Sequence, residues 1–94
     1  MNNITNAINT ASARVRVRGA TVKWFDLAAA EWRTVRMTNP DAARAWAWGA
    51  RVAIALTNLG WSALDAARAI NQLSDAERGS RWTNAARRIA KRGA

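Results

Sequence analysis

The spacing of apolar residues predicts a mainly helical chain. In residues 22–37, VKWFDLAAAEWRTVRM, apolar positions recur every three or four residues, as in a helix that buries one face. The central AAAE has high helix propensity, and no turn residue interrupts the run. We therefore expect a helix over 22–37.

A second helix begins with the clearest start signal in the chain. Asn39 can cap it, Pro40 suits the first helical position, and Asp41 meets the positive end of the helix dipole. The stretch that follows, ARAWAWGARVAIALTNLG, also alternates like a strand, but its alanines and its length favour a helix. We expect this helix over 40–59, ending before Gly60.

Two further helices follow with little connecting sequence. Ser62 predicts a cap for a helix over 62–73, and Ser74 with Glu77 forms a capping box for a helix over 75–92. Helices joined this closely must turn sharply, a geometry that simple corners share with helix-turn-helix units. The similarity to a helix-turn-helix is weak because the turn lacks a central glycine.

Strand-like alternation is strictest in residues 13–25, ARVRVRGATVKWF, on either side of Gly19-Ala20. A two-residue turn at Gly19-Ala20 would place Arg18 opposite Thr21 and Arg16 opposite Lys23, with the valines on the other side. The pairing of Arg16 with Lys23 is unfavourable unless an anion covers it. We expect a short basic β-hairpin here, the alternative being a continuation of an N-terminal helix.

The predicted fold is therefore mainly α: a compact bundle of about four helices with a possible N-terminal hairpin. We expect a flexible arm or short helix over 1–12 and a single helical domain over 13–94. The alternative is an α+β fold, in which a three-stranded sheet of residues 14–18, 21–25 and 32–37 packs on helices. It ranks second because LAAAE lacks the glycine or asparagine that such a loop usually needs.

Composition narrows the chemistry. The chain has no cysteine and no histidine, which removes thiolate metal sites, disulfides and the usual general base. Most of its six carboxylates stand where helices begin, so they are read as capping charges. We expect no enzyme activity, no metal and no cofactor.

Charge points to the partner. The net charge is +9, which favours a polyanion such as nucleic acid, although a GC-rich genome would also enrich arginine. The basic residues gather at two places, and together they are the predicted nucleic-acid contacts: Arg14, Arg16, Arg18, Lys23, Arg78, Arg81, Arg87, Arg88, Lys91 and Arg92. Contact with the phosphate backbone is the predicted function, with DNA favoured over RNA.

A protein-interaction module is the alternative function, docking on an acidic partner or forming a homo-oligomer. On the predicted 40–59 helix, Trp46 lies with small residues on the expected core side, while Trp48 lies between Arg44 and Arg51. These last three residues are the predicted protein interface. The apolar run 45–59 is too short to span a membrane, and no signal sequence is apparent, so we expect a cytoplasmic protein.

Overall fold

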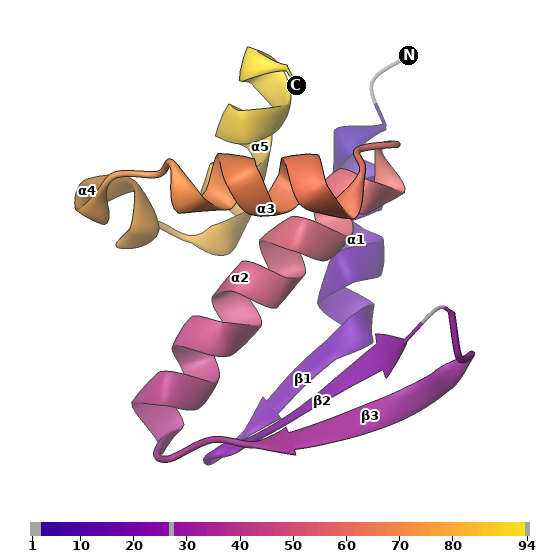
Figure 1. Ribbon diagram of the computed structural model, residues 1–94, viewed down its shortest axis with the longest axis vertical. Coiled ribbons are helices and arrows are strands. Elements are labelled where there is room, and N and C mark those ends of the chain that lie inside the picture. The colour runs from indigo at the N-terminus through magenta and orange to yellow at the C-terminus, as the bar shows by residue number, and fades with distance from the viewer. Residues whose placement is uncertain (1–2, 27, 94) are drawn as a thin grey trace.

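The computed structural model describes residues 3–26 and 28–93. Residues 1, 2, 27 and 94, which fall in the predicted arm, the predicted 22–37 helix and the predicted 13–94 domain, lie outside the described residues. The elements, in chain order, are α1 (Ile4–Arg14), β1 (Val15–Arg18), β2 (Thr21–Asp26), β3 (Glu31–Arg36), α2 (Pro40–Asn58), α3 (Ala63–Asn71), α4 (Asp75–Arg78) and α5 (Trp82–Arg92). The three strands form a sheet at one end of the molecule, and α2 runs from it to the remaining helices at the other end (Figure 1).

The fold is α+β, so the prediction of a mainly α bundle is wrong and its three-stranded alternative is right. The sheet is antiparallel with the order β1-β2-β3. The predicted 22–37 helix is instead the hairpin of β2 and β3. The run also alternates on both sides of LAAAE, and its valines and aromatic residues suit a pleated sheet packed on a helix.

Asp26 provides the turn chemistry that LAAAE lacks. Its carboxylate accepts hydrogen bonds from the backbone N–H groups of Ala28 and Ala29, at 3.0 and 3.3 Å. Ala30 then adopts a left-handed conformation, with φ of 54°. This conformation costs a residue with a Cβ about 1 kcal/mol, so glycine is the residue usually expected there. Because alanine occupies the position instead, the sequence of the loop does not resemble a turn.

The predicted hairpin at Gly19-Ala20 is confirmed with its register. Arg18 pairs with Thr21 and Arg16 with Lys23, and Gly19 has φ of 59°. The first strand is one residue shorter than the alternative predicted, because Arg14 is the last residue of α1. The N-terminal segment thus forms a helix that runs directly into β1.

The helix boundaries follow their caps. Asn39, Ser62 and Ser74 each accept a backbone hydrogen bond as predicted. The single helix predicted over 75–92 is wrong, because α4 ends at Arg78 and α5 begins at Trp82. The backbone carbonyl of Ser80, between them, accepts a hydrogen bond from Trp48 Nε1 at 2.9 Å, so this connection is fixed to α2.

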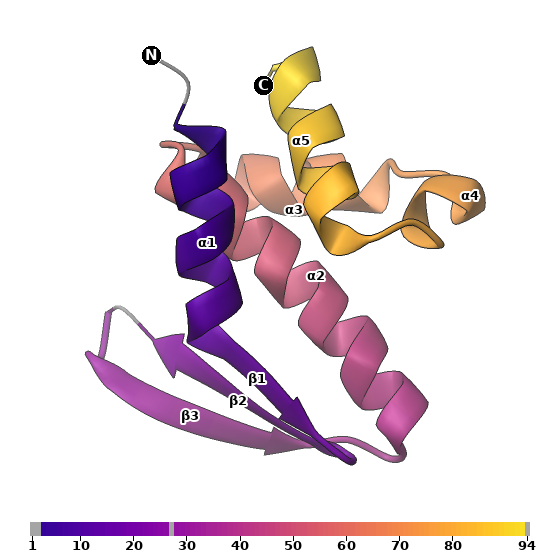
Figure 2. The ribbon, with the colours of Figure 1, turned by 180° about the vertical axis from the view of Figure 1, so that it is seen from behind.

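The core has two parts that share α2. On one side α2 packs against the sheet, where Val15, Val22, Ala43 and Ala47 are buried together. On another side it packs against α1, α3 and α5 around Leu56 (Figure 2). Trp46 packs against the part of the core beside the sheet, and Trp48 packs against the part between the helices. Both tryptophans therefore contribute to the core.

Candidate functional site

The sheet has one face packed on α2 and one face directed away from it. Val15, Val17, Val22, Trp24 and Val35 belong to the packed face, as their burial against α2 shows. Because side chains alternate along a strand, the register places the intervening residues on the other side. We call this the outer face, and it consists of Arg16, Arg18, Thr21, Lys23, Phe25, Trp32, Thr34 and Arg36.

The outer face is basic and carries no carboxylate among its residues. Its four cations are exposed, and Arg16, Arg18, Thr21 and Lys23 line a shallow hollow of about 340 Å³. Arg16 lies directly opposite Lys23, a like-charge pair that weakens the sheet unless an anion covers it.

The two acidic residues of the sheet fall on the packed face, at its far end. Asp26 pairs with Glu31, and Arg33 bridges both at 2.6 and 3.5 Å. The hydrogen bond from Arg33, followed by that from the Ala29 backbone, lowers the pKa of the Asp26 carboxyl. These carboxylates are therefore occupied and do not neutralise the cations of the outer face.

Aromatic side chains complete the outer face. Trp32 is 43% exposed, and its ring meets that of Phe25 edge-on at 5.6 Å. The guanidinium of Arg16 lies over the Trp32 ring, 4.8 Å from its centre. A cation stacked on an indole keeps its donors in one plane, which suits contact with a phosphate or a base edge.

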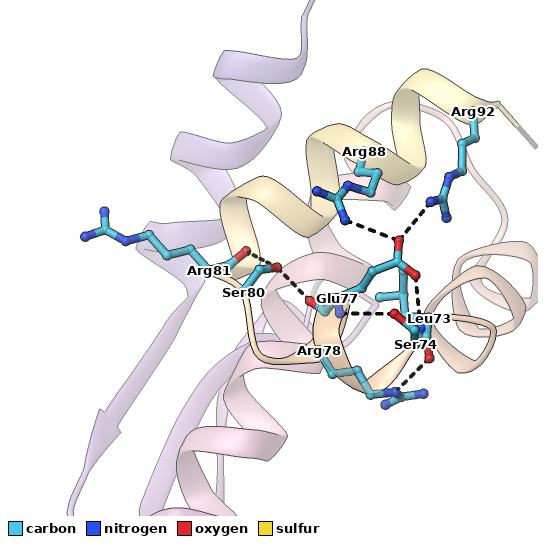
Figure 3. Close-up of polar contacts among 8 residues, drawn as sticks. All are labelled: Leu73, Ser74, Glu77, Arg78, Ser80, Arg81, Arg88 and Arg92. Carbon is cyan, nitrogen blue, oxygen red and sulfur yellow. Dashed lines mark hydrogen bonds and ion pairs between the residues drawn. The ribbon is translucent and has the colours of Figure 1, made fainter.

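At the C-terminal end, three of the predicted contacts have partners within the chain. Arg88 and Arg92 converge on the carboxylate of Glu77, at 3.4 and 2.8 Å (Figure 3). Arg78 donates to the backbone carbonyls of Ile70 and Leu73 at the end of α3. These three arginines hold α3, α4 and α5 together.

Glu77 is the centre of this cluster. Its carboxylate also accepts the Ser74 backbone N–H at 3.0 Å, completing the capping box of α4. The Ser74 N–H and then the hydrogen bond from Arg92 lower the pKa of Glu77 to about 2. A sequence prediction that treats it only as a helix-start charge misses these arginines, which lie more than ten residues away.

The other predicted C-terminal contacts are differently placed. The Arg81 side chain points away from the Glu77 cluster (Figure 3), and Arg87 and Lys91 line a hollow beside α1. None of the three has an ion-pair partner among residues 3–26 and 28–93. Arg14 lies half-buried at the end of α1 and is not part of the outer face.

The predicted protein-interface residues come together in a groove of about 470 Å³. Arg44, Trp48 and Arg51 line it with Val17, Gly19 and Trp82, so it lies between β1, α2 and α5. We call it the Trp48 groove. Arg51 donates to the backbone carbonyl of Val15 at 3.2 Å, and burial lowers the pKa of its guanidinium. Arg44 pairs with Asp41 one turn earlier in α2.

Several site residues were not identified from the sequence. The main prediction places Phe25 and Thr34 on a helix, whereas the three-stranded alternative places them on strands 21–25 and 32–37, where alternation puts both on a sheet face. Val17 and Trp82 reach the Trp48 groove only through tertiary packing, for which the sequence has no local signal.

The fold and these surfaces define a small α+β protein with an acid-free basic sheet face. No protein-family model, no curated protein and no solved structure matches the chain. In the described part of the chain, none of the helices combines the length and the apolar character needed to cross a membrane.

Proposed function

We propose that this protein binds DNA through the outer face of its sheet. The observation that carries the proposal is the concentration of Arg16, Arg18, Lys23 and Arg36 on one face with an exposed tryptophan and no acid. Such a face attracts phosphates and gains affinity by releasing their counterions. The like-charge pairing within the sheet supports an anionic ligand, since a phosphate between the two side chains removes their repulsion.

The shape of the face favours duplex DNA over duplex RNA. The major groove of B-DNA is wide enough to admit a β-ribbon, whereas that of A-form RNA is too narrow for side chains to read. Thr21 and Thr34 stand between the cations and can donate to phosphate or base edges. The C-terminal arginines support the proposal less, because Glu77 occupies two of them.

The salt dependence of binding tests the proposal. The affinity for a short DNA duplex is measured over a salt series for the wild type and for the double variant Arg16→Gln, Lys23→Gln. The logarithm of the affinity falls linearly with the logarithm of the salt concentration, and removing two phosphate contacts should make this slope less steep by about 2. The matched control, Arg87→Gln with Lys91→Gln, removes the same charge from α5 and should leave the slope near that of the wild type.

Two results would contradict the proposal. One is a duplex that does not bind at low salt. The other is a salt dependence that becomes less steep in the α5 double variant but stays unchanged in the sheet double variant. That result would place the contact on α5. An RNA duplex in the same series separates the two nucleic acids, and tighter binding to RNA would overturn the assignment to DNA.

Docking on an acidic protein is a second candidate function. One observation favours it: Arg44, Trp48 and Arg51 line a groove that is separate from the outer face. Paired indoles and guanidiniums are typical of the central contacts in protein interfaces.

A further inference from the structure

We infer that the Trp48 groove binds an acidic, extended peptide segment of a protein partner, which adds as a fourth strand to the free edge of β1. This inference rests on the second candidate function and is independent of DNA binding. It gives that function a binding mode, a backbone contact and a ligand chemistry.

The free edge of β1 supplies the backbone contact. A two-residue hairpin turn makes Arg18 and Thr21 a hydrogen-bonded pair, so the backbone groups of Val17 point away from β2. The Val15 carbonyl confirms this alternation, because it points outward and accepts from Arg51 at 3.2 Å. No described strand pairs with this side of β1. Val17 therefore presents a donor and an acceptor to an incoming strand.

The groove beside this edge is large enough and has two aromatic walls. Its volume of about 470 Å³ falls within the usual range for ligand sites. Trp48 is held by its hydrogen bond to the Ser80 carbonyl, and Trp82 begins α5. In Figure 2, β1 and α2 run beside each other, with the connection between α4 and α5 next to the middle of α2. The walls thus belong to elements that are fixed against one another.

Charge selects an acidic occupant. Arg51 has a buried Nε without a hydrogen-bond partner among the described residues, and Arg44, which also lines the groove, has a side chain that is 65% exposed. Asp41, the ion-pair partner of Arg44, is largely exposed and can be replaced by a ligand carboxylate. A strand added to β1 would also place alternate side chains beside Arg16 and Arg18 on the outer face. Acidic side chains of the peptide therefore lie near cations whether they point into the Trp48 groove or toward the outer face.

A peptide fits this site better than a nucleic acid does. Pairing with the Val17 N–H and C=O requires a main chain that offers both an acceptor and a donor at strand spacing. A phosphodiester backbone offers acceptors but no matching donors, so it would leave the Val17 carbonyl without a partner.

The probe is a fluorescein-labelled, end-capped peptide of alternating Glu and Val, measured by fluorescence anisotropy with the full chain. Val17→Pro removes the outward N–H at an edge position that tolerates proline, and should weaken binding about tenfold. Arg44→Gln should weaken it up to about fivefold. Arg68→Gln, an exposed position on α3 with the same charge change, is the matched control and should bind like the wild type.

Two further measurements examine the ladder without altering the protein. The Val17 amide should exchange with solvent more slowly when the peptide is bound. A peptide with alternate amides N-methylated should lose binding when the methylated amides are those that face β1, and should keep it when they are those that face away, even if Val17→Pro fails to fold.

The outcomes are distinct. Peptide binding that depends on Arg44, with no protection of Val17 and no effect of N-methylation, overturns strand addition while acidic docking stands. No binding of the peptide overturns both. A DNA duplex that displaces the peptide, and still does so from the Arg16→Gln, Lys23→Gln variant, makes the groove a nucleic-acid site and overturns the inference.

Discussion

The guanidinium of Arg16 lies over the ring of Trp32 although the two residues stand on opposite edges of the sheet. The contact crosses the central strand β2, and Phe25 of that strand also packs edge-on against the indole. Trp32 is therefore oriented before any ligand arrives while 43% of it stays exposed. An oriented aromatic residue with a stacked cation loses little conformational entropy on binding.

Trp32→Ala should lower the affinity for DNA clearly while lowering the free energy of unfolding only slightly. We expect a loss of about fivefold to tenfold in affinity, because the ring supplies apolar contact and orients Arg16. The free energy of unfolding should fall by no more than about 1 kcal/mol, since the residue is on the surface. Binding is measured by anisotropy with a labelled duplex, and stability by urea unfolding.

Leu64 provides the matched control for this variant. It is also a large exposed apolar residue, at 60%, but it lies on α3 away from the sheet. Leu64→Ala should leave DNA affinity unchanged. Equal losses in both variants would mean that Trp32 has no specific part in binding.

The sequence predicted the elements whose stop and start signals are local. Asn39, Ser62 and Ser74 mark helix starts through their own side chains, and Gly19 marks the hairpin through its backbone freedom. The loop between β2 and β3 has no glycine or asparagine, and its turn depends on Asp26 in the preceding strand, so high helix propensity led to the wrong prediction over 22–37. The signal that was available there is the alternation on both sides of the loop.

The helical end shows a different limit of sequence reasoning. Glu77 has a visible local role in its capping box, but its arginine partners depend on how α5 folds back on α4. Six basic residues after the helix start read as a binding surface, whereas three of them form bonds within the chain. Only tertiary structure separates occupied cations from available ones.

Ala30→Gly should stabilise the protein. Ala30 has φ of 54°, where a Cβ is strained and glycine is not. Glycine gains freedom in the unfolded chain, which offsets part of this relief, so the net gain should be about 0.5–1 kcal/mol in the free energy of unfolding. Ala28→Gly, in the same loop without positive φ, serves as the control and should be neutral or destabilising. A loss of stability in Ala30→Gly would show that the left-handed backbone carries no strain.

Trp48→Phe should destabilise the protein by about 1 kcal/mol through a single hydrogen bond. The variant keeps an aromatic ring against the helical core but removes the indole N–H that donates to the Ser80 carbonyl at 2.9 Å. Trp61→Phe is the comparison, since Trp61 packs on the same cluster and its indole donates no hydrogen bond within the described residues. Urea unfolding of both variants separates the bond from the loss of ring area, and equal effects would assign the change to packing alone.

The Ser74 N–H and the arginines that bind the Glu77 carboxylate should make stability depend on acid pH. The pKa of this carboxyl is about 2 in the folded protein and 4.5 ordinarily. A lowered carboxyl pKa adds stability that is complete above the ordinary value and is lost as the pH falls through the folded value. The melting temperature of the wild type should therefore decrease between about pH 5 and pH 2.

Glu77→Gln tests this dependence directly. The variant cannot hold Arg88 and Arg92 as ion pairs, so it should melt at a lower temperature than the wild type at pH 7. Its melting temperature should change less between pH 5 and pH 2, because the group that titrates is gone, and the two curves should approach each other at the acid end. Asp65→Asn makes the same charge change at a carboxylate without an ion pair among the described residues, and its curve should keep the slope of the wild type. Parallel curves for the wild type and Glu77→Gln would mean that Arg88 and Arg92 are as free to bind a phosphate as Arg87.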